Sequence, residues 1–318
     1  MNVLEQLKTH SKVVADSGDF ESVRKYKPLD STTNPSLILA AAQDNKYDYL
    51  LDGAIAYAKK KSTDTTEQLR IAFEKLFIDF GLEILKIVPG RVSIEVDARL
   101  SFDVESSVRK ARELIALFEE AGIDRQRILI KLASTWEGIK AAEILNRDHI
   151  HCNMTLLFSM PQAIACAEAD LQLISPFVGR VLDWYKKEQP GRVFQPEEEP
   201  GVLLVRAIFN YYKKFGYQTE IMCASFRNSA EILELAGCDL MTIAPSLLNE
   251  LENAKGMLQK KLLVEEAAVS DVKKIQLDEK KFRWLLNQDA MATEKLAEGI
   301  RRFTDDIIKL ELLLSKRL

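Results

Sequence analysis

The sequence predicts a closed (β/α)8 barrel with additional helices and a helical extension at its C-terminus. Short apolar runs alternate with helix-length amphipathic segments, which is typical of a parallel sheet with right-handed crossovers. Eight such runs lie within about the first 250 residues of the 318-residue chain. Eight strand–helix units in that length fit a closed barrel better than an open sheet.

The eight predicted strands are the short apolar runs of the chain. They cover Val13–Asp16, Leu29–Thr32, Val92–Val96, Ile128–Ala133, Cys152–Leu156, Leu171–Phe177, Ile221–Ser225 and Leu240–Ala244. Strands of a closed parallel barrel are covered on both faces and should be almost continuously apolar. Polar residues within these runs therefore need a reason.

The helix between the third and fourth predicted strands has the clearest pattern. Ser101 or Asp103 can cap its N-terminus, and Gly122 ends it. Its apolar residues step by four and three along one face: Val104, Val108, Ala111, Ile115 and Phe118. Further helices are predicted at Pro35–Gln43, Lys46–Lys61, Thr65–Leu85 and Val202–Phe215.

Two segments fall outside the strand–helix pattern. Between Phe177 and Ile221, a proline-containing stretch with three consecutive glutamates is expected to be an exposed loop. Beyond Ala244 no strand is predicted, and helices are expected at Lys273–Leu286 and Thr293–Leu314. We therefore expect one domain, residues 1–318, with about residues 256–318 as a C-terminal helical extension packed on the barrel.

The last predicted helix has an apolar stripe that must be buried. The stripe consists of Leu296, Ile300, Phe303, Ile307, Leu310 and Leu314. Packing against the barrel is favoured over a self-associating coiled coil, because fewer than about three heptads is short for an independent coiled coil.

Composition excludes several classes of protein. The chain has 44 Lys+Arg and 48 Asp+Glu, a net charge of −4, which argues against nucleic-acid binding because that needs a basic excess. No apolar run reaches the roughly 18–20 residues that span a bilayer, and the first residues lack the apolar core of a secretory signal. We expect a cytoplasmic protein with neither nucleic-acid nor membrane partners.

Cysteines and histidines give no strong metal pattern. None of the four cysteines forms a CxxC pair, and reduced, buried thiols are expected. His149, His151 and Cys152 could together hold a metal. That alternative is disfavoured, because alternation along a strand would point His151 and Cys152 to opposite faces.

Lys131 lies within the apolar run Ile128–Ala133. A charged ammonium is costly to desolvate there, which favours the neutral amine. A neutral lysine is a nucleophile toward carbonyls and forms a Schiff base. For a lone lysine in a strand, the alternative of a structural ion pair with a carboxylate is the more common one.

Other polar residues lie in or directly after the predicted strands. Glu95 alternates onto the same face as Ser93 and Asp97, which we expect to be the barrel interior. Asp16 ends the first strand. Hydroxyl and amide groups occur in similar places, at Asn34, Asn153, Thr155 and Ser175. Together with Lys131 they lie toward the C-terminal half of the strands, where barrel enzymes keep their chemistry.

Two arginines follow strands in the second half of the barrel. Arg180 and Arg227 both fall on loops between a strand and the next helix. A pair of guanidinium groups on that rim suits a phosphate group, and surface salt bridges are the alternative. No glycine-rich dinucleotide or P-loop motif is present.

Several segments resemble the transaldolase family in order and spacing. Asp30–Ser36 (DSTTNPS) and Ile128–Gly138 (ILIKLASTWEG) are similar to its two signature motifs. The likeness covers essentially the whole chain and continues in Gly90–Ser101, His151–Ser159, Leu173–Arg180 and Ala224–Asn228.

This resemblance implies a reaction. Transaldolases are class I aldolases without metal or cofactor, acting in the non-oxidative pentose phosphate pathway and often as dimers. They transfer a dihydroxyacetone unit from sedoheptulose 7-phosphate to glyceraldehyde 3-phosphate, which gives erythrose 4-phosphate and fructose 6-phosphate. The expected partners are these phosphorylated sugars and a possible second copy of the chain.

The resemblance also implies roles for individual residues. Lys131 matches the Schiff-base lysine, and Glu95 matches an acid/base group that acts through a water held with Thr155. Asp16 matches the carboxylate that exchanges a proton with the C4 hydroxyl. The substrate-binding positions are Thr32, Asn34, Asn153, Ser175 and Phe177, and the phosphate positions are Arg180, Ser225 and Arg227.

The chain departs from the family pattern at three minor positions, and two rival functions stay open. Ser17 and Ile94 stand where Thr is frequent, and Cys223 stands where Gly is usual. A fructose 6-phosphate aldolase is the nearest rival, but such chains are much shorter and have tyrosine in place of Glu95. A non-catalytic barrel that binds sugar phosphates is the other rival.

Overall fold

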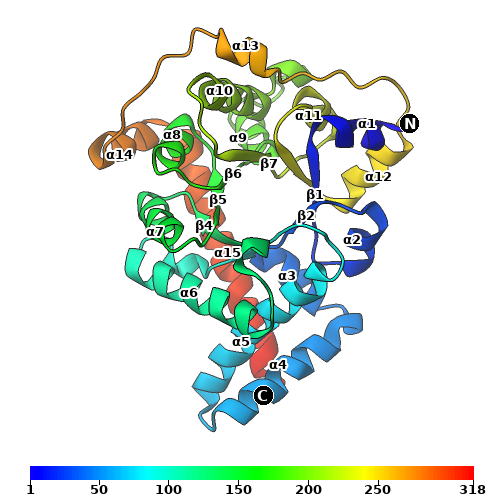
Figure 1. Cartoon of the computed structure of the whole chain (residues 1–318), viewed down its shortest axis with the longest axis vertical. Coiled ribbons are helices and arrows are strands. Elements are labelled where there is room, and N and C mark those ends of the chain that lie inside the picture. The colour runs from blue at the N-terminus through cyan, green and yellow to red at the C-terminus, as the bar shows by residue number, and fades with distance from the viewer.

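The computed structural model describes residues 1–318 and is a closed barrel of eight parallel strands (Figure 1). The strands follow one another around the barrel in chain order, and β8 pairs with β1 to close it. They are β1 (Lys12–Asp16), β2 (Asp30–Thr32), β3 (Val92–Glu95), β4 (Ile128–Ala133), β5 (Cys152–Leu157), β6 (Leu173–Pro176), β7 (Glu220–Cys223) and β8 (Leu240–Ile243). The predicted fold class is confirmed, and every predicted strand overlaps an observed one.

Helices surround the barrel on its outside (Figure 1). The predicted helix with the clearest pattern is α6, which Asp103 caps by accepting a hydrogen bond from the Ser106 amide. The surrounding helices are α2 (Phe20–Tyr26), α3 (Pro35–Ala42), α4 (Asp48–Lys61), α5 (Thr65–Leu85), α6 (Val104–Glu120), α7 (Trp136–Arg147), α8 (Met160–Glu168), α9 (Gly179–Glu188), α10 (Pro200–Lys214), α11 (Ser229–Glu234) and α12 (Pro245–Asn253).

A short N-terminal helix, α1 (Val3–His10), was not predicted. Asn2 and Glu5 form a reciprocal capping box at its start, which is a sequence signal for a helix N-terminus. The helix buries Leu4 and Leu7 and packs against α12 and β1.

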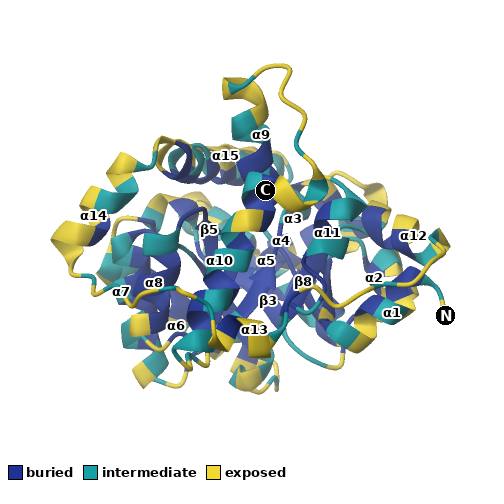
Figure 2. Cartoon of the chain, turned by 90° about the horizontal axis from the view of Figure 1, so that it is seen from above, coloured by how far each residue is buried: buried dark blue, intermediate teal, exposed yellow.

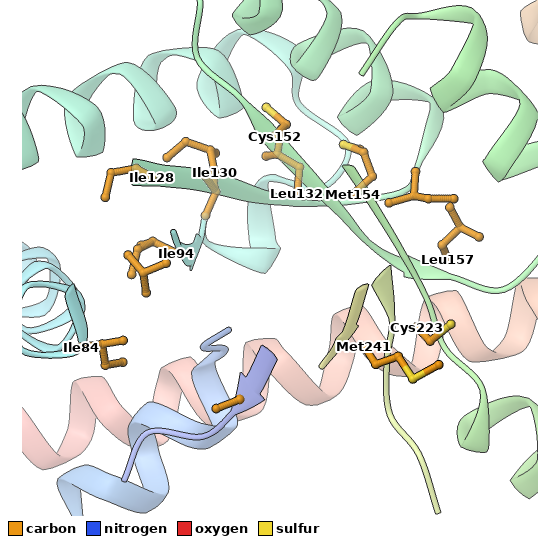
Figure 3. Packing of buried hydrophobic residues seen from close by; sticks show 14 of the residues in the cluster. Ile84, Ile94, Ile128, Ile130, Leu132, Cys152, Met154, Leu157, Cys223 and Met241 are labelled. Atoms are coloured by element: carbon orange, nitrogen blue, oxygen red, sulfur yellow. The ribbon is translucent and has the colours of Figure 1, made fainter. Parts of the chain in front are cut away.

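Strand residues alternate between the barrel interior and the surrounding helices. Figure 3 shows outward-facing residues of β3, β4 and β5 packed in the outer core, among them Ile94 and Met154. Cys223 lies in this outer layer beside Met241, so its thiol faces the helices and not the interior. Inside the barrel, five apolar side chains fill the lower layer: Val14, Leu129, Leu173, Met222 and Leu240. The polar strand residues stand above this layer.

Asp97 does not share the interior with Ser93 and Glu95, so that prediction is wrong. β3 ends at Glu95, and Asp97 begins the short 3-10 helix η2 (Ala98–Leu100). Its carboxylate accepts a hydrogen bond from the Arg99 amide at 2.8 Å and pairs with the Arg99 guanidinium. Side chains alternate between the two faces only within a strand, and Asp97 lies beyond the end of β3. Its side chain is therefore outside the barrel interior.

The C-terminal segment contains α13 (Val264–Ala268), α14 (Glu279–Gln288) and α15 (Ala290–Ser315). The predicted helix Lys273–Leu286 begins later than expected, at Glu279. Asp278 caps it there, and the preceding segment is held outside the helix because the Ile275 amide donates to Tyr211 Oη at 3.1 Å. No helix in the structure combines the length and apolar character that crossing a membrane requires.

The last helix lies across one end of the barrel, together with α9 (Figure 2). It contacts α3, α5, α9, β5 and η2. Its whole apolar stripe is buried: Leu296, Ile300, Phe303, Ile307, Leu310 and Leu314. The strands beneath that end point their carboxyl termini toward α15, so the helix partly covers the mouth of the barrel.

Candidate active site

Three neighbouring strands place a carboxylate, an amine and an amide side by side. Glu95 on β3 is in register with Lys131 on β4, which is in register with Asn153 on β5. Lys131 is buried, and its Nζ donates to the Thr33 carbonyl at 3.1 Å. The same Nζ lies 3.3 Å from Glu95 Oε2.

The ion pair that the sequence left as an alternative is therefore present, but it leaves hydrogen-bonding capacity of the carboxylate unused. Glu95 Oε2 accepts no well-aligned hydrogen bond although it is buried. Lys131 also lines a cavity of about 260 Å3 at the mouth of the barrel. The amine is thus in contact with a carboxylate and accessible to a small molecule at once.

Nine of the predicted site residues line this cavity. They are Asp16, Thr32, Asn34, Lys131, Ser175, Phe177, Arg180, Ser225 and Arg227. Glu95, Asn153 and Thr155 do not line it, and lie buried on the adjacent strands β3 and β5. The structure therefore gathers residues that are up to 211 positions apart in sequence, as 227 − 16 = 211.

Two carboxyl groups lie deep in the site: Glu95 is buried, and Asp16 is partly exposed where it lines the cavity. Burial raises the pKa of Asp16, while the charge of Lys131 and a hydrogen bond from Thr32 Oγ1 at 2.9 Å oppose the shift. Burial likewise raises the pKa of Glu95, again opposed by Lys131. Carboxyl groups with raised pKa values in a cleft are suited to proton transfer near neutral pH.

Thr155 lies on β5, two residues beyond Asn153 on the strand beside Lys131. Its hydroxyl is buried and has no hydrogen-bond partner in the chain, and the same is true of Glu95 Oε2. Buried polar atoms without partners are rare in folded proteins and call for an explanation.

A chain of hydrogen bonds fixes the amide on β5. Ser175 Oγ donates to Asn153 Oδ1 at 2.6 Å, and Asn153 Nδ2 donates to Ser93 Oγ at 3.0 Å. The Asn153 side chain is thereby locked in one orientation before any ligand arrives. Asn34, which lines the cavity, caps α3 by accepting a hydrogen bond from the Leu37 amide at 3.0 Å.

Arg180 is the least satisfied cation of the site. Its guanidinium lies over the rings of Phe177 and Phe303, at 4.9 and 5.5 Å from their centroids. Burial lowers the pKa of Arg180 to about 10, and the nearby charges of Arg302 and Arg227 add to the effect. Two like charges beside a buried cation favour an anionic ligand there.

Arg227 combines both interpretations that the sequence left open. It pairs with Asp183 at 2.7 Å and its side chain is 38% exposed, as a surface salt bridge would be. It also lines the cavity and donates to Ser225 Oγ at 3.3 Å. Ser225 has a φ of +62°, a strained conformation of the kind that clusters at ligand-binding sites.

Arg227 lies on a loop between strand and helix, as predicted, but Arg180 is the second residue of α9, so the prediction of a loop is wrong there. The segments 177–180 and 224–228, which are called the arginine loops below, touch each other closely. The Gly179 amide donates to the Ser225 carbonyl at 3.0 Å. A Cβ atom on Gly179 would lie 2.4 Å from Arg227 Cγ and 2.5 Å from the Ser225 carbonyl oxygen, so only glycine fits. This close approach fixes Arg180 relative to Arg227.

Several residues of the site were not predicted from the sequence. Thr242 shares a 2.6 Å hydrogen bond with Thr32, and the Thr33 carbonyl accepts from Lys131. Phe303 and Arg302 reach the site from α15, and Arg302 lines the cavity. The pattern of α15 indicated only an apolar stripe, so nothing local suggested that its polar neighbour would reach the barrel mouth.

The arrangement suits chemistry on a carbonyl compound that carries an anionic group. A buried amine can add to the carbonyl, and the two carboxyl groups beside it can transfer protons. The arginines at the mouth can hold the anion. The histidine–cysteine alternative lies elsewhere: Cys152 is buried in the outer core, and His151 Nε2 lies 2.9 Å from Gln126 Oε1.

Comparisons with known proteins agree with this arrangement. The family model for transaldolase/fructose-6-phosphate aldolase matches residues 13–314. A transaldolase of Rattus norvegicus is 58% identical over 318 residues, which is 100% of this chain and 94% of that protein. A transaldolase of Shewanella sp. (strain W3-18-1) is 57% identical over 317 residues, 100% of this chain and 99% of that protein. A transaldolase of Homo sapiens is 56% identical over 318 residues, 100% and 94% respectively.

Proposed function

Since the chain belongs to the transaldolase/fructose-6-phosphate aldolase family, we propose that it acts as a transaldolase through a Schiff base on Lys131. The enzyme is a transferase that acts on sugar phosphates. Its proposed reaction moves a dihydroxyacetone unit from sedoheptulose 7-phosphate to glyceraldehyde 3-phosphate and releases erythrose 4-phosphate. Fructose 6-phosphate is the second product.

The observation that carries the mechanism is the buried Lys131 amine on the cavity wall, 3.3 Å from Glu95. The amine attacks the ketone carbon of the donor once Glu95 has taken its proton. Glu95 then transfers the protons that turn the carbinolamine into an iminium ion and water. A water molecule between Glu95 Oε2 and Thr155 Oγ1 would satisfy both unpaired atoms and relay these protons.

Asp16 serves the carbon–carbon bond cleavage. Its carboxylate takes the proton of the C4 hydroxyl as the C3–C4 bond breaks, and the bonding electrons flow into the iminium to form an enamine. The raised pKa of Asp16, caused by burial, makes it a stronger base than an exposed aspartate. The same proton returns to the aldehyde of the acceptor when the new bond forms.

The remaining predicted residues hold the substrate. Asn34, Asn153 and Ser175 would bind the hydroxyl groups of the dihydroxyacetone part, with Thr32 holding Asp16. Arg180, Ser225 and Arg227 would bind the phosphate beside Phe177. Because α15 lies across the barrel mouth (Figure 2), it would also shield the enamine from protonation by bulk water.

Borohydride trapping tests this function directly. The protein is incubated with fructose 6-phosphate, reduced, digested and analysed by mass spectrometry. We expect a dihydroxyacetone-derived adduct on Lys131, lost in Lys131→Met and kept in Lys187→Met, whose side chain is 77% exposed. No adduct in the unmodified protein, or an adduct on another lysine, would sink the mechanism.

A second assay separates a transaldolase from a fructose 6-phosphate aldolase. Release of dihydroxyacetone from fructose 6-phosphate without an acceptor should be slow, and fast release would make the chain a fructose 6-phosphate aldolase instead.

The proposed pathway is the non-oxidative pentose phosphate pathway, and the proposed location is the cytoplasm. We also propose a homodimer, which sedimentation equilibrium would contradict by giving a mass near 36.1 kDa.

A further inference from the structure

Two buried carboxyl groups lie beside the arginine loops, and the proposed mechanism does not use them. Glu199 is the N-cap residue of α10 and the last of the three consecutive glutamates. The sequence predicted an exposed loop there, and Glu197 and Glu198 are indeed exposed, but Glu199 is only 6% exposed. Glu231 on α11 is completely buried.

Each carboxyl group is tied to the loop that carries Arg227. Glu231 Oε2 accepts a hydrogen bond from the Arg227 backbone amide at 2.6 Å. Asn228 links the two residues, because its Oδ1 accepts a hydrogen bond from the Glu231 backbone amide at 2.9 Å and its Nδ2 donates to Glu199 Oε1 at 3.4 Å. The backbone position of Arg227 therefore depends on both glutamates.

The other two oxygens of the pair have no partner. Glu199 Oε2 and Glu231 Oε1 are both buried without a hydrogen bond. The two side chains are neighbours, because Glu199 directly follows the 3-10 helix η4 (Pro196–Glu198), which packs against α11, and it also contacts Asn228 at the start of α11. Two ionised carboxylates in such a place would repel each other, and neither could donate a hydrogen bond. One proton shared between these oxygens satisfies both at once, as in other carboxyl pairs.

The charged groups around the pair are neutralised elsewhere. The Arg227 side chain turns to Asp183 at 2.7 Å. On α10 and α11, Arg206 pairs with Glu234 at 3.5 Å, and Lys261 also reaches Glu234, at 3.1 Å. On α12, which packs against α11, Glu252 pairs with Lys25 at 3.3 Å. None of these cations pairs with Glu199 or Glu231. Burial, with Glu199 adding to it, raises the pKa of Glu231 to about 8.

The start of α10 also touches the segment 177–180, which leads into Arg180. A Cβ atom on Gly201, two residues after Glu199, would lie 2.2 Å from the Val178 carbonyl oxygen. Val178 is two residues before Arg180. The start of α10 therefore contacts both arginine loops, through Gly201 on one side and through Glu199 and Asn228 on the other.

We propose that Glu199 and Glu231 form a proton-sharing clasp that positions both arginine loops, so that anion affinity at the barrel mouth falls when the shared proton leaves. They are positioning residues, since neither touches the cavity. The inference rests on the proposed function for the identity of the phosphate site. Linkage requires the reverse effect too: an anion bound by the arginines favours the protonated clasp.

Sulfate is the probe of choice, because its charge stays at −2 throughout the pH range of interest. Its dissociation constant is measured by isothermal titration calorimetry from pH 6.5 to 9.5, at constant ionic strength. We expect the dissociation constant to rise by roughly threefold to tenfold as pH passes about 8, as one added negative charge several ångströms away would cause.

Glu199→Gln is the matched variant, because its amide can donate permanently to Glu231 Oε1 and still accept from Asn228. Other groups near the cavity also titrate, so the comparison is the ratio of the wild-type to the variant dissociation constant. This ratio should stay constant below pH 7 and then rise threefold to tenfold, by the same rough estimate. Glu198→Gln removes an exposed neighbouring charge, and its ratio should not change with pH.

The reciprocal variant Glu231→Gln should behave as Glu199→Gln does, which keeps the test valid if one of the two fails to fold. A pH-independent ratio in both variants, or an equal response in Glu198→Gln, would overturn the clasp. Borohydride trapping at Lys131 does not depend on the clasp, so a failed clasp with intact trapping leaves the proposed function standing. A missing adduct on Lys131 together with a pH-dependent ratio would overturn the proposed mechanism and leave the clasp standing.

Discussion

Strands β3, β4 and β5 carry Glu95, Lys131 and Asn153 within the barrel, whereas Arg180 and Arg227 lie just beyond β6 and β7. The first three are in register on adjacent strands and are all buried. The positions of the two arginines depend on contacts between the segments 177–180 and 224–228, and the Arg227 side chain is 38% exposed.

This difference matches what each side has to do. Strand register fixes a side chain to within a fraction of an ångström, which covalent chemistry requires. Loops tolerate movement, which suits a phosphate that must enter and leave. We therefore expect changes on the strand side to reduce kcat, and changes on the loop side to raise the KM for phosphorylated substrates.

The largest effect is expected for Lys131→Met. Without the amine no iminium can form, so kcat should fall by roughly four orders of magnitude or more. A coupled assay of erythrose 4-phosphate formation measures the rate, and circular dichroism checks the fold. The exposed control Lys187→Met should keep full activity, and substantial activity in Lys131→Met would break the contrast between the two sides.

Glu95→Gln should lower kcat by about 10²- to 10³-fold, because it removes one proton-transfer group but keeps the amine. The variant should also lose the fall in kcat that the wild-type enzyme shows on the acidic side of its pH profile. Burial raises the pKa of Glu95, so the wild-type enzyme should lose the basic form of this group as pH falls, at a higher pH than an exposed glutamate would. The pH profile of kcat tests this, and an unchanged acid limb in the variant would assign that limb to another group.

The arginine side should respond in KM, with unequal effects. Arg180→Ala should raise the KM for glyceraldehyde 3-phosphate by about 100-fold, because no carboxylate pairs with Arg180 and its full charge is available to the ligand. Arg227→Ala should raise it by only about tenfold, since Asp183 already neutralises part of that charge. Unphosphorylated glyceraldehyde is the control substrate, and an equal KM change with it would show that neither arginine acts on the phosphate.

Arg302→Ala should have the smallest effect, a KM increase of roughly threefold. Its side chain lines the cavity but is 60% exposed, and its closest carboxylate, Glu298, is 3.8 Å away. Water screens such a charge strongly. Raising the salt concentration should therefore remove the difference between Arg302→Ala and wild type while leaving that of Arg180→Ala in place.

Much of the fold followed from local patterns. Eight apolar runs predicted eight strands, because strands that are buried on both faces cannot be polar. Alternation correctly placed Ile94 outside the barrel and Glu95 inside, but it failed at Asp97, where the strand had already ended. The helix predicted from Lys273 began at Glu279, because a contact with Tyr211, distant in sequence, holds Ile275 outside it.

Local patterns also predicted the site residues on the strands, but they did not predict those that come from a distant helix. Polar residues at strand ends had to meet, because the carboxyl ends of parallel strands share one edge. Arg302 carried no comparable signal, since its helix lies across the barrel mouth only through burial of an apolar stripe that could have packed in several ways. The position of α15 over the barrel mouth, and with it the position of Arg302, was decided by tertiary packing.

The sequence by itself determined the strands, their inward-facing polar residues and the resemblance that gave these residues roles. These features depend on periods of two and on short segments that are read locally. Only the tertiary structure decided that Glu199 and Glu231, 32 residues apart (231 − 199 = 32), share one buried place beside two arginine loops. Whether a carboxyl group in a loop is solvated or shares a proton depends on what folds over it, and the closing of the barrel determines that.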